Sequence, residues 1–300
     1  MSFDVVYTWV NGSDQEYLKT RNAHANIKKD TNPERFRDTF QMIRYSLRSL
    51  EKYFNIFNKV YILTARPQVP DWLDLSNERV ELVHHDQVIP EIYLPTFNSN
   101  VIESFLHKIP DLSENFLYMN DDFLFGAPVS LKSFYKDNKY RIFNTMFGEN
   151  LKWRIYDGYH DLIGLGIIEH QPIMINKDYW EEAYALFPEK TEKTRQSKFR
   201  DDRNLCAYKL YRYHMLANHK GESDPVWITE LNNIFRFHKL TNNFSKQQAF
   251  FDEMKKTSPE FYCLNDDLRD KPNQKVVELV KEFLEQKYPE PSSYEKRSSS

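Results

Sequence analysis

The chain has 300 residues, of which 40% are hydrophobic and 28% charged, so it is long enough to bury a sizeable core as a globular protein. Its formal net charge of −3 excludes a general attraction to nucleic acid or to an anionic membrane surface. Its two cysteines, Cys206 and Cys263, lie far apart, which argues against a disulfide framework or a zinc site built on cysteines. No signal-like or membrane-spanning run is visible. We therefore expect a cytoplasmic protein, with peripheral contact at the inner face of the membrane left open.

The first predicted element is a strand over residues 3–10, where β-branched and aromatic residues lead into an Asn11-Gly12 turn. Asp4 lies near the start of this strand. A buried carboxylate there either caps a neighbouring loop or faces a ligand, and the sequence favours neither. The polar stretch over residues 19–32 predicts a loop or a short helix.

Apolar residues at helical spacing then predict a helix over residues 40–54, with Asp38 or Thr39 as its N-cap. Three arginines gather at its head: Arg35, Arg37 and Arg44. Free backbone N–H groups at a helix start favour anions, and guanidinium groups added there suit a diphosphate. Each arginine taken alone also fits an ordinary solvated helix start.

Two short buried strands are predicted at residues 60–64 and 80–83, and a helix that begins after residues 95–99 is predicted to run to about residue 108. A further strand follows at residues 116–126. This β-α-β-β-α-β order is typical of a Rossmann-like α/β fold with a mostly parallel sheet flanked by helices.

The run over residues 116–126 is the most informative segment of the chain. An apolar stretch ends in Asn120-Asp121-Asp122 and returns to apolar residues before Gly126. A buried strand of this kind delivers acidic groups to its carboxyl end, where open α/β sheets bind ligands. Adjacent aspartates repel each other, and a bound cation relieves the repulsion. An Asx-rich turn accounts for the same residues.

The second half of the sequence is less regular. Strands are predicted at residues 141–147 and 173–175, helices at residues 178–187 and 205–216, and a basic loop at residues 190–203 that holds Arg200. His170 lies between apolar residues before a proline turn, where it is either a satisfied core histidine or a base.

The Asn-Asp-Asp pattern recurs near the end of the chain. An apolar run from residue 261 ends in Asn265-Asp266-Asp267, and a final helix with one apolar face follows. We predict that both runs converge on one divalent cation, Mg²⁺ or Mn²⁺, because these ions take carboxylates together with phosphate oxygens. The tail over residues 289–300 is polar and predicted to be disordered.

With these segments in view, the chain resembles the Stealth family. Residues 4–14 (DVVYTWVNGSD) resemble its first signature, and residues 44–50, 94–99 and 119–122 resemble the second. The segment with His170 and the Phe199-Arg200 loop resembles the third, and residues 263–267 (CLNDD) resemble the fourth. One departure is Thr39-Phe40-Gln41, which stands where the family usually has an asparagine and an acidic residue after Asp38.

The resemblance implies a hexose-1-phosphate transferase, a phosphotransferase of capsular or exopolysaccharide synthesis. It would move sugar-1-phosphate from a UDP-sugar to a glycan hydroxyl and release UMP, with Mg²⁺ or Mn²⁺ as cofactor. The expected architecture is a GT-A-like catalytic domain over residues 1–288, with a nucleotide-binding half (1–126) and an acceptor half (127–288) whose C-terminal segments complete the active site. The implied catalytic residues are His170, Arg200 and Asp121; the implied binding residues are Asp4, Trp9, Asn11, Gly12, Arg37, Arg44, Asn98 and Asn120; and the implied metal ligands are Asp122 and Asp266.

Two other interpretations fit parts of the sequence. A metal-dependent glycosyltransferase would use a similar acidic motif but attack the anomeric carbon and release UDP. A non-catalytic carbohydrate-binding protein that has kept the fold would consume no UDP-sugar at all. The nucleotide that is released distinguishes the three.

Overall fold

The computed structural model describes residues 1–26, 28–144, 170–227 and 234–297. A five-stranded sheet with the order β3-β2-β1-β4-β8 lies at its centre. Its strands are β1 (Asp4–Thr8), β2 (Val60–Thr64), β3 (Val80–His84), β4 (Asn115–Asn120) and β8 (Ile173–Asn176). The first four strands run parallel and β8 pairs antiparallel with β4. The predicted α/β class with a mostly parallel sheet flanked by helices is confirmed.

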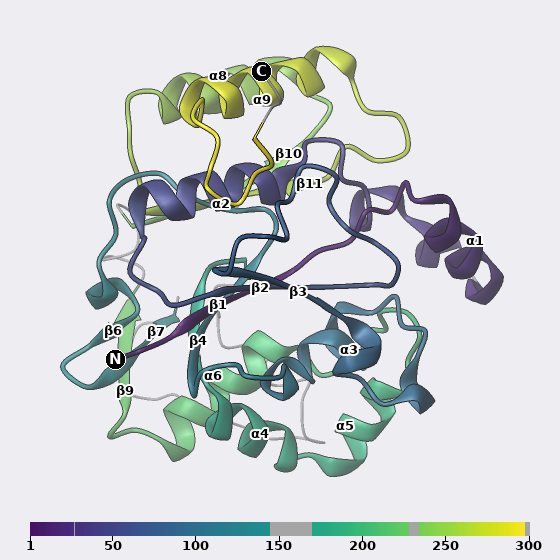
Figure 1. Ribbon diagram of the computed structural model, residues 1–300, viewed down its shortest axis with the longest axis vertical. Coiled ribbons are helices and arrows are strands. Elements are labelled where there is room, and N and C mark those ends of the chain that lie inside the picture. The colour runs from purple at the N-terminus through teal and green to yellow at the C-terminus, as the bar shows by residue number, and fades with distance from the viewer. Residues whose placement is uncertain (27, 145–169, 228–233, 298–300) are drawn as a thin grey trace.

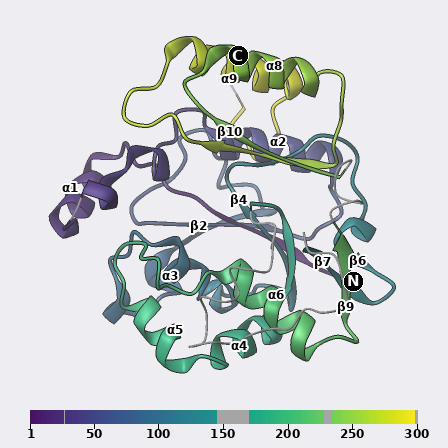
Figure 2. The ribbon, with the colours of Figure 1, turned by 180° about the vertical axis from the view of Figure 1, so that it is seen from behind.

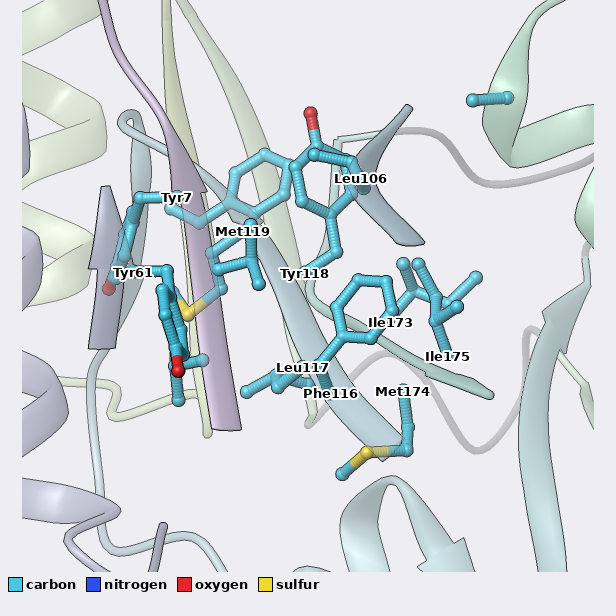
Figure 3. Packing of buried hydrophobic residues seen from close by; sticks show 14 of the residues in the cluster. Tyr7, Tyr61, Leu106, Phe116, Leu117, Tyr118, Met119, Ile173, Met174 and Ile175 are labelled. Atoms are coloured by element: carbon cyan, nitrogen blue, oxygen red, sulfur yellow. The ribbon is translucent and has the colours of Figure 1, made fainter. Parts of the chain in front are cut away.

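The central strands are apolar on both faces because helices cover both sides of the sheet. Tyr7, Phe116 and Met119 are fully buried, and Figure 3 shows these strand residues packed beside Ile173 and Ile175 from β8. Their burial forms one continuous core that includes residues from the flanking helices. This core fixes the positions of the strand ends, where the candidate site lies.

Helix α2 (Met42–Tyr53) separates the central sheet from a second, three-stranded sheet (Figure 1). The second sheet has the order β10-β11-β5, and helices α8 (Phe244–Met254) and α9 (Gln274–Lys287) cover its outer side. Its strands are β10 (Phe235–Leu240), β11 (Phe261–Asp266) and β5 (Phe123–Phe125). Ile43 and Leu47 of α2 belong to the central core, whereas Met42 and Tyr45 belong to the second core.

The predicted strand over residues 116–126 is two strands in different sheets. β4 ends at Asn120, and β5 pairs antiparallel with β11 so that Phe123 lies opposite Cys263. Ser46 of α2 donates a hydrogen bond to the Phe123 carbonyl, and the Phe125 amide donates to Ser49 Oγ at 3.0 Å. These serines satisfy the backbone of β5 on its unpaired side. The two aspartates therefore lie at the junction between the sheets.

The other face of the central sheet is covered by α3 (Ser99–Glu103), α4 (Lys177–Ala185), α5 (Pro188–Arg195) and α6 (Ala207–Asn218), as Figures 1 and 2 show. Helix α1 (Gln15–His24) projects to one side. A small third sheet has the order β6-β7-β9, with strands β6 (Tyr135–Lys136), β7 (Lys139–Asn144) and β9 (Ser223–Trp227). Short 3₁₀ helices occur at Lys28–Thr31, Pro33–Arg35, His85–Gln87, Glu91–Tyr93, Leu106–Lys108 and Leu131–Ser133.

Several predicted boundaries are wrong. The N-cap of α2 is Gln41 and not, as predicted from the sequence, Asp38 or Thr39; the Asp38 carboxylate instead accepts from Trp9 Nε1 at 3.1 Å. The helix predicted to reach residue 108 ends at Glu103, since Trp180 Nε1 donates at 3.1 Å to the carbonyl that the next helical turn would use.

Two features of the second half also differ. The predicted basic loop over residues 190–203 begins as the last turns of α5, because Pro188 starts that helix at its N1 position. The predicted strand over residues 141–147 is β7 up to Asn144, and residues 145–147 lie outside the described residues. Within the described ranges, no helix combines the length and the apolar character needed to cross a membrane.

The tail was predicted to be disordered from residue 289, but residues 289–297 pack against the body of the protein. Tyr294 is fully buried, and Glu295 forms a bridge with Leu73. The Glu295 carboxylate accepts from Arg44 Nε at 2.5 Å and from Arg48 Nε at 2.6 Å. These buried ion pairs, formed with residues about 250 positions away in the sequence, hold a segment whose composition alone indicated disorder.

Candidate active site

A cavity of about 430 Å³ opens where the carboxyl ends of β1 and β4 lie side by side. Thr8 of β1 pairs in register with Asn120 of β4, and both line the cavity. The chain leaves β1 toward β2 and β3 on one side and returns to β4 on the other, so this is the topological switch point of the sheet. Open α/β sheets bind their ligands at this point.

Three carboxylates meet in the cavity: Asp38, Asp121 and Asp122. Burial, and next the charges of Asp122 and Asp38, raise the pKa of Asp121 well above its ordinary range. Burial also raises the pKa of Asp38 to about 6, against the opposing effect of the hydrogen bond from Trp9. Carboxylates held together at such a cost favour a cation between them.

The two Asn-Asp-Asp runs converge, as predicted. The Leu264 amide donates to the Asp122 carbonyl at 3.1 Å because β5 and β11 are paired. Asp122 Oδ2 accepts from Cys263 Sγ at 3.2 Å and from Asn265 Nδ2 at 3.3 Å. Asp122 Oδ1 is buried and has no hydrogen-bond partner among the described residues. An unpartnered buried carboxylate oxygen is costly in an apoprotein and is available to a cation.

The structure gives Asp266 a different neighbour from the one expected. Arg37 Nε and Nη2 donate to its two carboxylate oxygens at 2.6 and 3.0 Å, and the Leu268 amide donates to Oδ1 at 2.9 Å. A bidentate pair of this kind fixes the guanidinium plane, and together with the Leu268 amide it uses most of the acceptor capacity of the carboxylate. In this arrangement Asp266 positions Arg37, and its predicted role as a metal ligand stays a prediction.

His170 lines the same cavity. The metal-binding atoms of Asp122, His170 and Cys263 all lie within 4.8 Å of one another. His170 Nδ1 is buried and without a hydrogen-bond partner in the part of the chain described, and the residue has a positive φ of 61°. A non-glycine residue in this conformation, in the lining of a cavity, is typical of a functional position.

Two arginines from different segments face the opposite part of the cavity. Burial, and next the charge of Arg200, lower the pKa of Arg35 from its ordinary value, which places the two guanidinium groups within electrostatic range. Arg200 Nη2 donates to Ser99 Oγ at 2.5 Å. Asn98 holds the loop that carries Arg200, because its Nδ2 donates to the carbonyls of Ser197 and Phe199, each at 3.1 Å. Like charges kept together indicate a site for an anion.

Aromatic rings form one wall of the cavity. Phe97 stacks on Phe199 with ring centroids 5.1 Å apart, and Tyr17 meets Phe97 edge to face at 5.4 Å. Phe36 joins this cluster, and all four residues line the cavity. Such a wall offers a flat apolar surface to a planar ring.

The structure places five predicted site residues outside the cavity lining: Asp4, Asn11, Gly12, Arg44 and Asn98. Asp4 lies at the opposite end of β1, where its two oxygens accept from the amides of Lys59 and Ser113 at 3.2 and 2.7 Å. Arg44 pairs with Glu295, and Asn98 is buried behind the Arg200 loop.

The Asn11-Gly12 turn after β1 does not line the cavity but packs against a segment that does. The Asn11 backbone is bonded to the Gln68 side chain in both directions, at 2.9 and 2.8 Å. A Cβ on Gly12 would come within 2.3 Å of the Phe36 carbonyl, to which the Gly12 amide donates at 2.6 Å. Glycine therefore lets the segment that carries Arg35 and Arg37 lie against β1.

Sequence reasoning missed some residues that line or complete the site. Asp38 was interpreted as a helix cap, and Asn265 as part of a run rather than a partner of Asp122. The aromatic cluster gave no signal, because Phe36, Phe97 and Phe199 lie far apart in the sequence with no shared period. The sequence shows Cys263 in the CLNDD motif but not its bond to Asp122, because that bond depends on the pairing of β5 with β11.

The fold and the cavity define an α/β protein with an acidic and basic site at the switch point of its sheet. Three segments match one family: residues 1–26 match Stealth protein conserved region 1, residues 35–143 match conserved region 2, and residues 252–300 match conserved region 4. Together they span more than half of the sequence. The chain belongs to the Stealth family.

Curated relatives carry related names. The capsular polysaccharide phosphotransferase SacB of Neisseria meningitidis serogroup A is 28% identical over 319 residues, which cover 98% of this chain and 57% of SacB. The exopolysaccharide phosphotransferase cps2G of Lactiplantibacillus plantarum is 28% identical over 291 residues, covering 81% of this chain and 83% of cps2G. The chain thus spans little more than half of the length of SacB. These names agree with the predicted phosphotransferase class.

Two solved structures resemble the fold at low identity. The galactosyltransferase LgtC, in complex with donor and acceptor sugar analogs, is 11% identical with a TM-score of 0.46 over 94% of this chain and 95% of LgtC. The inositol-1-phosphate CTP transferase of T. maritima is 11% identical with a TM-score of 0.44 over 97% of this chain and 98% of that chain. At these scores we draw nothing from either likeness.

Proposed function

We propose that the chain transfers hexose-1-phosphate from a UDP-sugar to a glycan hydroxyl, forms a phosphodiester and releases UMP, in capsular or exopolysaccharide synthesis. One observation carries the proposal: Asp122, whose buried Oδ1 has no partner among the described residues, and His170, whose Nδ1 likewise has none there, line one cavity at the switch point of the sheet. The first suits a cation and the second suits a proton acceptor. The family's capsular and exopolysaccharide phosphotransferases support this assignment.

In the proposed reaction, the acceptor oxygen attacks the β-phosphorus of the UDP-sugar. The bond between that phosphorus and the bridging oxygen breaks, and UMP leaves with the bonding electrons. His170 takes the proton of the attacking hydroxyl, because its imidazole lines the cavity beside the carboxylates. Arg200, with Arg35 beside it, neutralises the phosphoryl oxygens on which charge develops.

The carboxylates fit a divalent cation, Mg²⁺ or Mn²⁺. Asp122 offers an oxygen without a partner among the described residues, and Asp121 and Asp38, whose pKa values are raised chiefly by burial, would add negative charge beside a bound cation. A bound ion of this kind neutralises the diphosphate and the leaving UMP. Asp266 contributes by holding Arg37 beside the same cavity through its bidentate pair.

The nucleotide occupies the end of the cavity formed by the aromatic wall and the β1 terminus. Phe97 and Phe199 offer a stacking surface for uracil, and Trp9 and Asn120 flank the diphosphate from the strand ends. In one catalytic domain, residues 1–126 then supply most of the nucleotide half, to which Phe199 adds part of the aromatic wall, and residues 127–288 supply the acceptor half. Asp4, Asn11, Gly12, Arg44 and Asn98 act as supports that position this machinery rather than as ligands.

The partners of this reaction are a UDP-sugar donor and a glycan acceptor, and its setting is the cytoplasm or the inner face of the membrane. The competing function is a metal-dependent glycosyltransferase, in which the acceptor attacks the anomeric carbon and UDP leaves. The same cavity serves both chemistries, so the released nucleotide decides between them.

The test is a screen of UDP-sugars with a glycan acceptor and Mg²⁺ or Mn²⁺, with nucleotides separated by chromatography. We expect UMP, and we expect its release to be abolished in Asp122→Asn. Asp252→Asn is the matched control, because this carboxylate of α8 is half exposed and, among the described residues, bonds only to neighbours on its own helix: Gln248 at 3.0 Å and Lys255, just past the helix end, at 3.5 Å. Release of UDP, or release of UMP by Asp122→Asn at the wild-type rate, overturns the proposal.

A further inference from the structure

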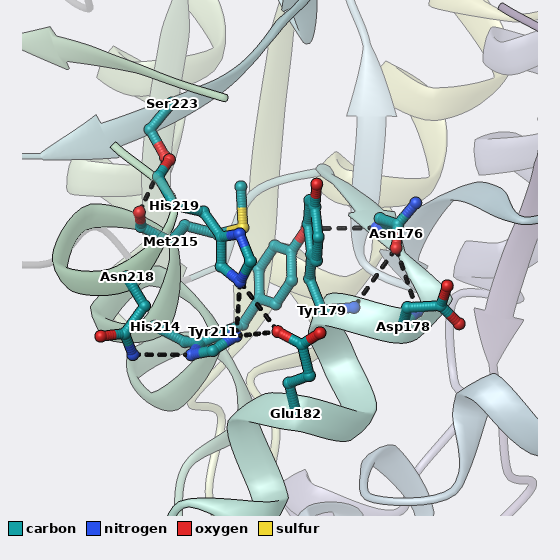
Figure 4. A network of polar contacts seen from close by, with 10 residues as sticks. All are labelled: Asn176, Asp178, Tyr179, Glu182, Tyr211, His214, Met215, Asn218, His219 and Ser223. Carbon is teal, nitrogen blue, oxygen red and sulfur yellow. Dashed lines mark hydrogen bonds and ion pairs between the residues drawn. The ribbon is translucent and has the colours of Figure 1, made fainter. Parts of the chain in front are cut away.

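A second cluster of potential metal ligands lies between α4 and the end of α6. Figure 4 shows Glu182 of α4 facing His214, in the last turns of α6, and His219, which follows that helix. Glu182 Oε2 lies 3.0 Å from His214 Nε2 and 2.8 Å from His219 Nε2, and the two Nε2 atoms are 3.0 Å apart. None of the three residues lines the cavity at the switch point. This cluster is therefore separate from the proposed active site.

Hydrogen bonds cannot account for all three contacts among Glu182, His214 and His219 at the same time. A neutral imidazole has one N–H group and a carboxylate has none, so the contact between the two rings needs one ring to donate and the other to accept. A ring that accepts through Nε2 cannot also donate from Nε2 to Glu182. At most two of the three contacts are hydrogen bonds at once, and two protonated rings repel each other. A cation in contact with all three lone pairs satisfies every group.

The dimensions are close to those of a zinc site. Zinc binds imidazole nitrogen and carboxylate oxygen at about 2.0–2.2 Å, so tetrahedral ligands lie about 3.4 Å apart. The three atoms therefore need to separate by only about 0.4–0.6 Å to accept the ion. Two imidazoles and one carboxylate suit a borderline transition ion such as Zn²⁺ rather than Mg²⁺, which prefers oxygen. The fourth position is left open.

Neighbouring residues hold the two rings in place. His214 Nδ1 lies 3.0 Å from Asn218 Nδ2. The oxygen and nitrogen of a carboxamide exchange places by a half turn, and the turned Asn218 would accept from Nδ1–H and fix the tautomer whose Nε2 lone pair faces the cluster. The His219 ring stacks on Tyr179 with centroids 4.0 Å apart. Ser223 Oγ donates to the His219 carbonyl at 2.7 Å and so fixes the chain just after the helix. Ring supports of this kind are characteristic of metal-binding histidines.

The surroundings are also suited to a cation that enters from solvent. The side chain of His214 is 4% exposed, whereas that of Glu182 is 51% exposed. The cluster thus has one buried ligand, His214, and one half-exposed ligand, Glu182, through whose side an ion can enter from solvent.

We propose that Glu182, His214 and His219 form a metal site for Zn²⁺ or a similar transition ion, and that the ion joins α4 to the end of α6. Helix α6 continues from this site to Tyr208, whose ring packs against Tyr118 of β4 at 5.7 Å. The ion therefore braces a helix that supports the central sheet. The inference does not depend on which sugar phosphate the chain transfers.

The test is zinc binding by the full chain after treatment with a chelator, measured by competition with a chromophoric zinc indicator. We expect wild type to bind one equivalent of Zn²⁺ more than His219→Ala, and Glu182→Gln to weaken that equivalent by at least about tenfold. Glu181→Gln is the matched control, since Glu181 binds Lys108 at 2.7 Å outside the cluster. Comparing variants with wild type removes any zinc held at the Asp122 cavity.

Folding of each variant is checked by circular dichroism in the presence of chelator. Because Glu182 is half exposed, Glu182→Gln keeps the test valid if His219→Ala does not fold. Zn²⁺ should raise the thermal midpoint of wild type and of Glu181→Gln but not that of Glu182→Gln. Equal zinc stoichiometry and affinity in wild type and Glu182→Gln overturn the proposal, and they do so whether or not UMP release is observed.

Discussion

The ion pairs of the C-terminal segment make a quantitative prediction. Glu295, with 2% of its side chain exposed, accepts from Arg44 and from both Nε and Nη2 of Arg48, while the Ser292 amide also donates to it at 2.9 Å. Glu295→Ala removes the carboxylate and leaves the Arg48 guanidinium, 9% exposed, without its partner. The substitution also removes one of the contacts that hold residues 289–297 against the body of the protein.

Removing one member of a buried ion pair costs about 3–5 kcal/mol, because the remaining charge is left desolvated. Arg44 is 31% exposed and recovers water, so its loss adds little. We therefore expect Glu295→Ala to lower the free energy of unfolding by about 3 kcal/mol. For a chain of this size, that corresponds to a fall in the thermal midpoint of roughly 6 °C or more.

The assay is thermal and urea unfolding followed by circular dichroism. Glu290→Gln is the matched control, because this exposed carboxylate lies on the same segment and should leave the midpoint unchanged. A loss below about 1 kcal/mol in Glu295→Ala would refute the reasoning, since it would mean that the segment is held by nothing more than a surface pair.

The same pair predicts a pH dependence. Burial alone would raise the pKa of Glu295, but the hydrogen bonds from Arg48, the Ser292 amide and Arg44 outweigh burial and lower it. A depressed carboxylate pKa stabilises the protein above the unfolded value of about 4.3, and this contribution is lost as the pH falls through the folded value. The difference in stability between wild type and Glu295→Ala should be full at pH 7 and shrink below about pH 4.

Three further predictions concern the cavity and its supports. His170→Ala should lower kcat by about 10²–10⁴-fold with little change in KM, measured as UMP release, and a loss below tenfold would remove His170 as the base. Asp4→Asn should lower the free energy of unfolding by about 1–3 kcal/mol in urea titrations and leave KM for the UDP-sugar unchanged, whereas a raised KM at full stability would restore a binding role. Asp266→Asn should raise KM and reduce kcat by releasing Arg37, while the affinity for Mg²⁺ stays within about threefold; a large loss of metal affinity would return Asp266 to the ligand set.

The central sheet was readable from the sequence because its strands are short apolar runs separated by turn residues. The split between β4 and β5 was not, since residues on both sides of Asp121-Asp122 are apolar and no period marks a change of sheet. The end of α3 at Glu103 depends on Trp180, and the ordered tail depends on Glu295 finding Arg48. Contacts between distant segments determine these features, and the local sequence pattern does not predict such contacts.

The same distinction applies to the site. The recurrence of Asn-Asp-Asp placed Asp122 near the CLNDD run, because two acidic strand ends suggest a shared site. The roles within that site depend on pairs that no spacing encodes, above all the Arg37–Asp266 pair. The sequence did not predict the aromatic wall either, because Phe97 and Phe199 come into contact only once Asn98 holds the loop that carries Phe199.

The central claim is that the chain moves a phosphoryl group together with the sugar. The most direct measurement uses a UDP-sugar labelled at the β-phosphorus, a glycan acceptor and Mg²⁺ or Mn²⁺, followed by separation of the glycan from the nucleotides. The account predicts label in the glycan, in a phosphodiester, together with unlabelled UMP. Label that stays in UDP, with unlabelled sugar in the glycan, would contradict it.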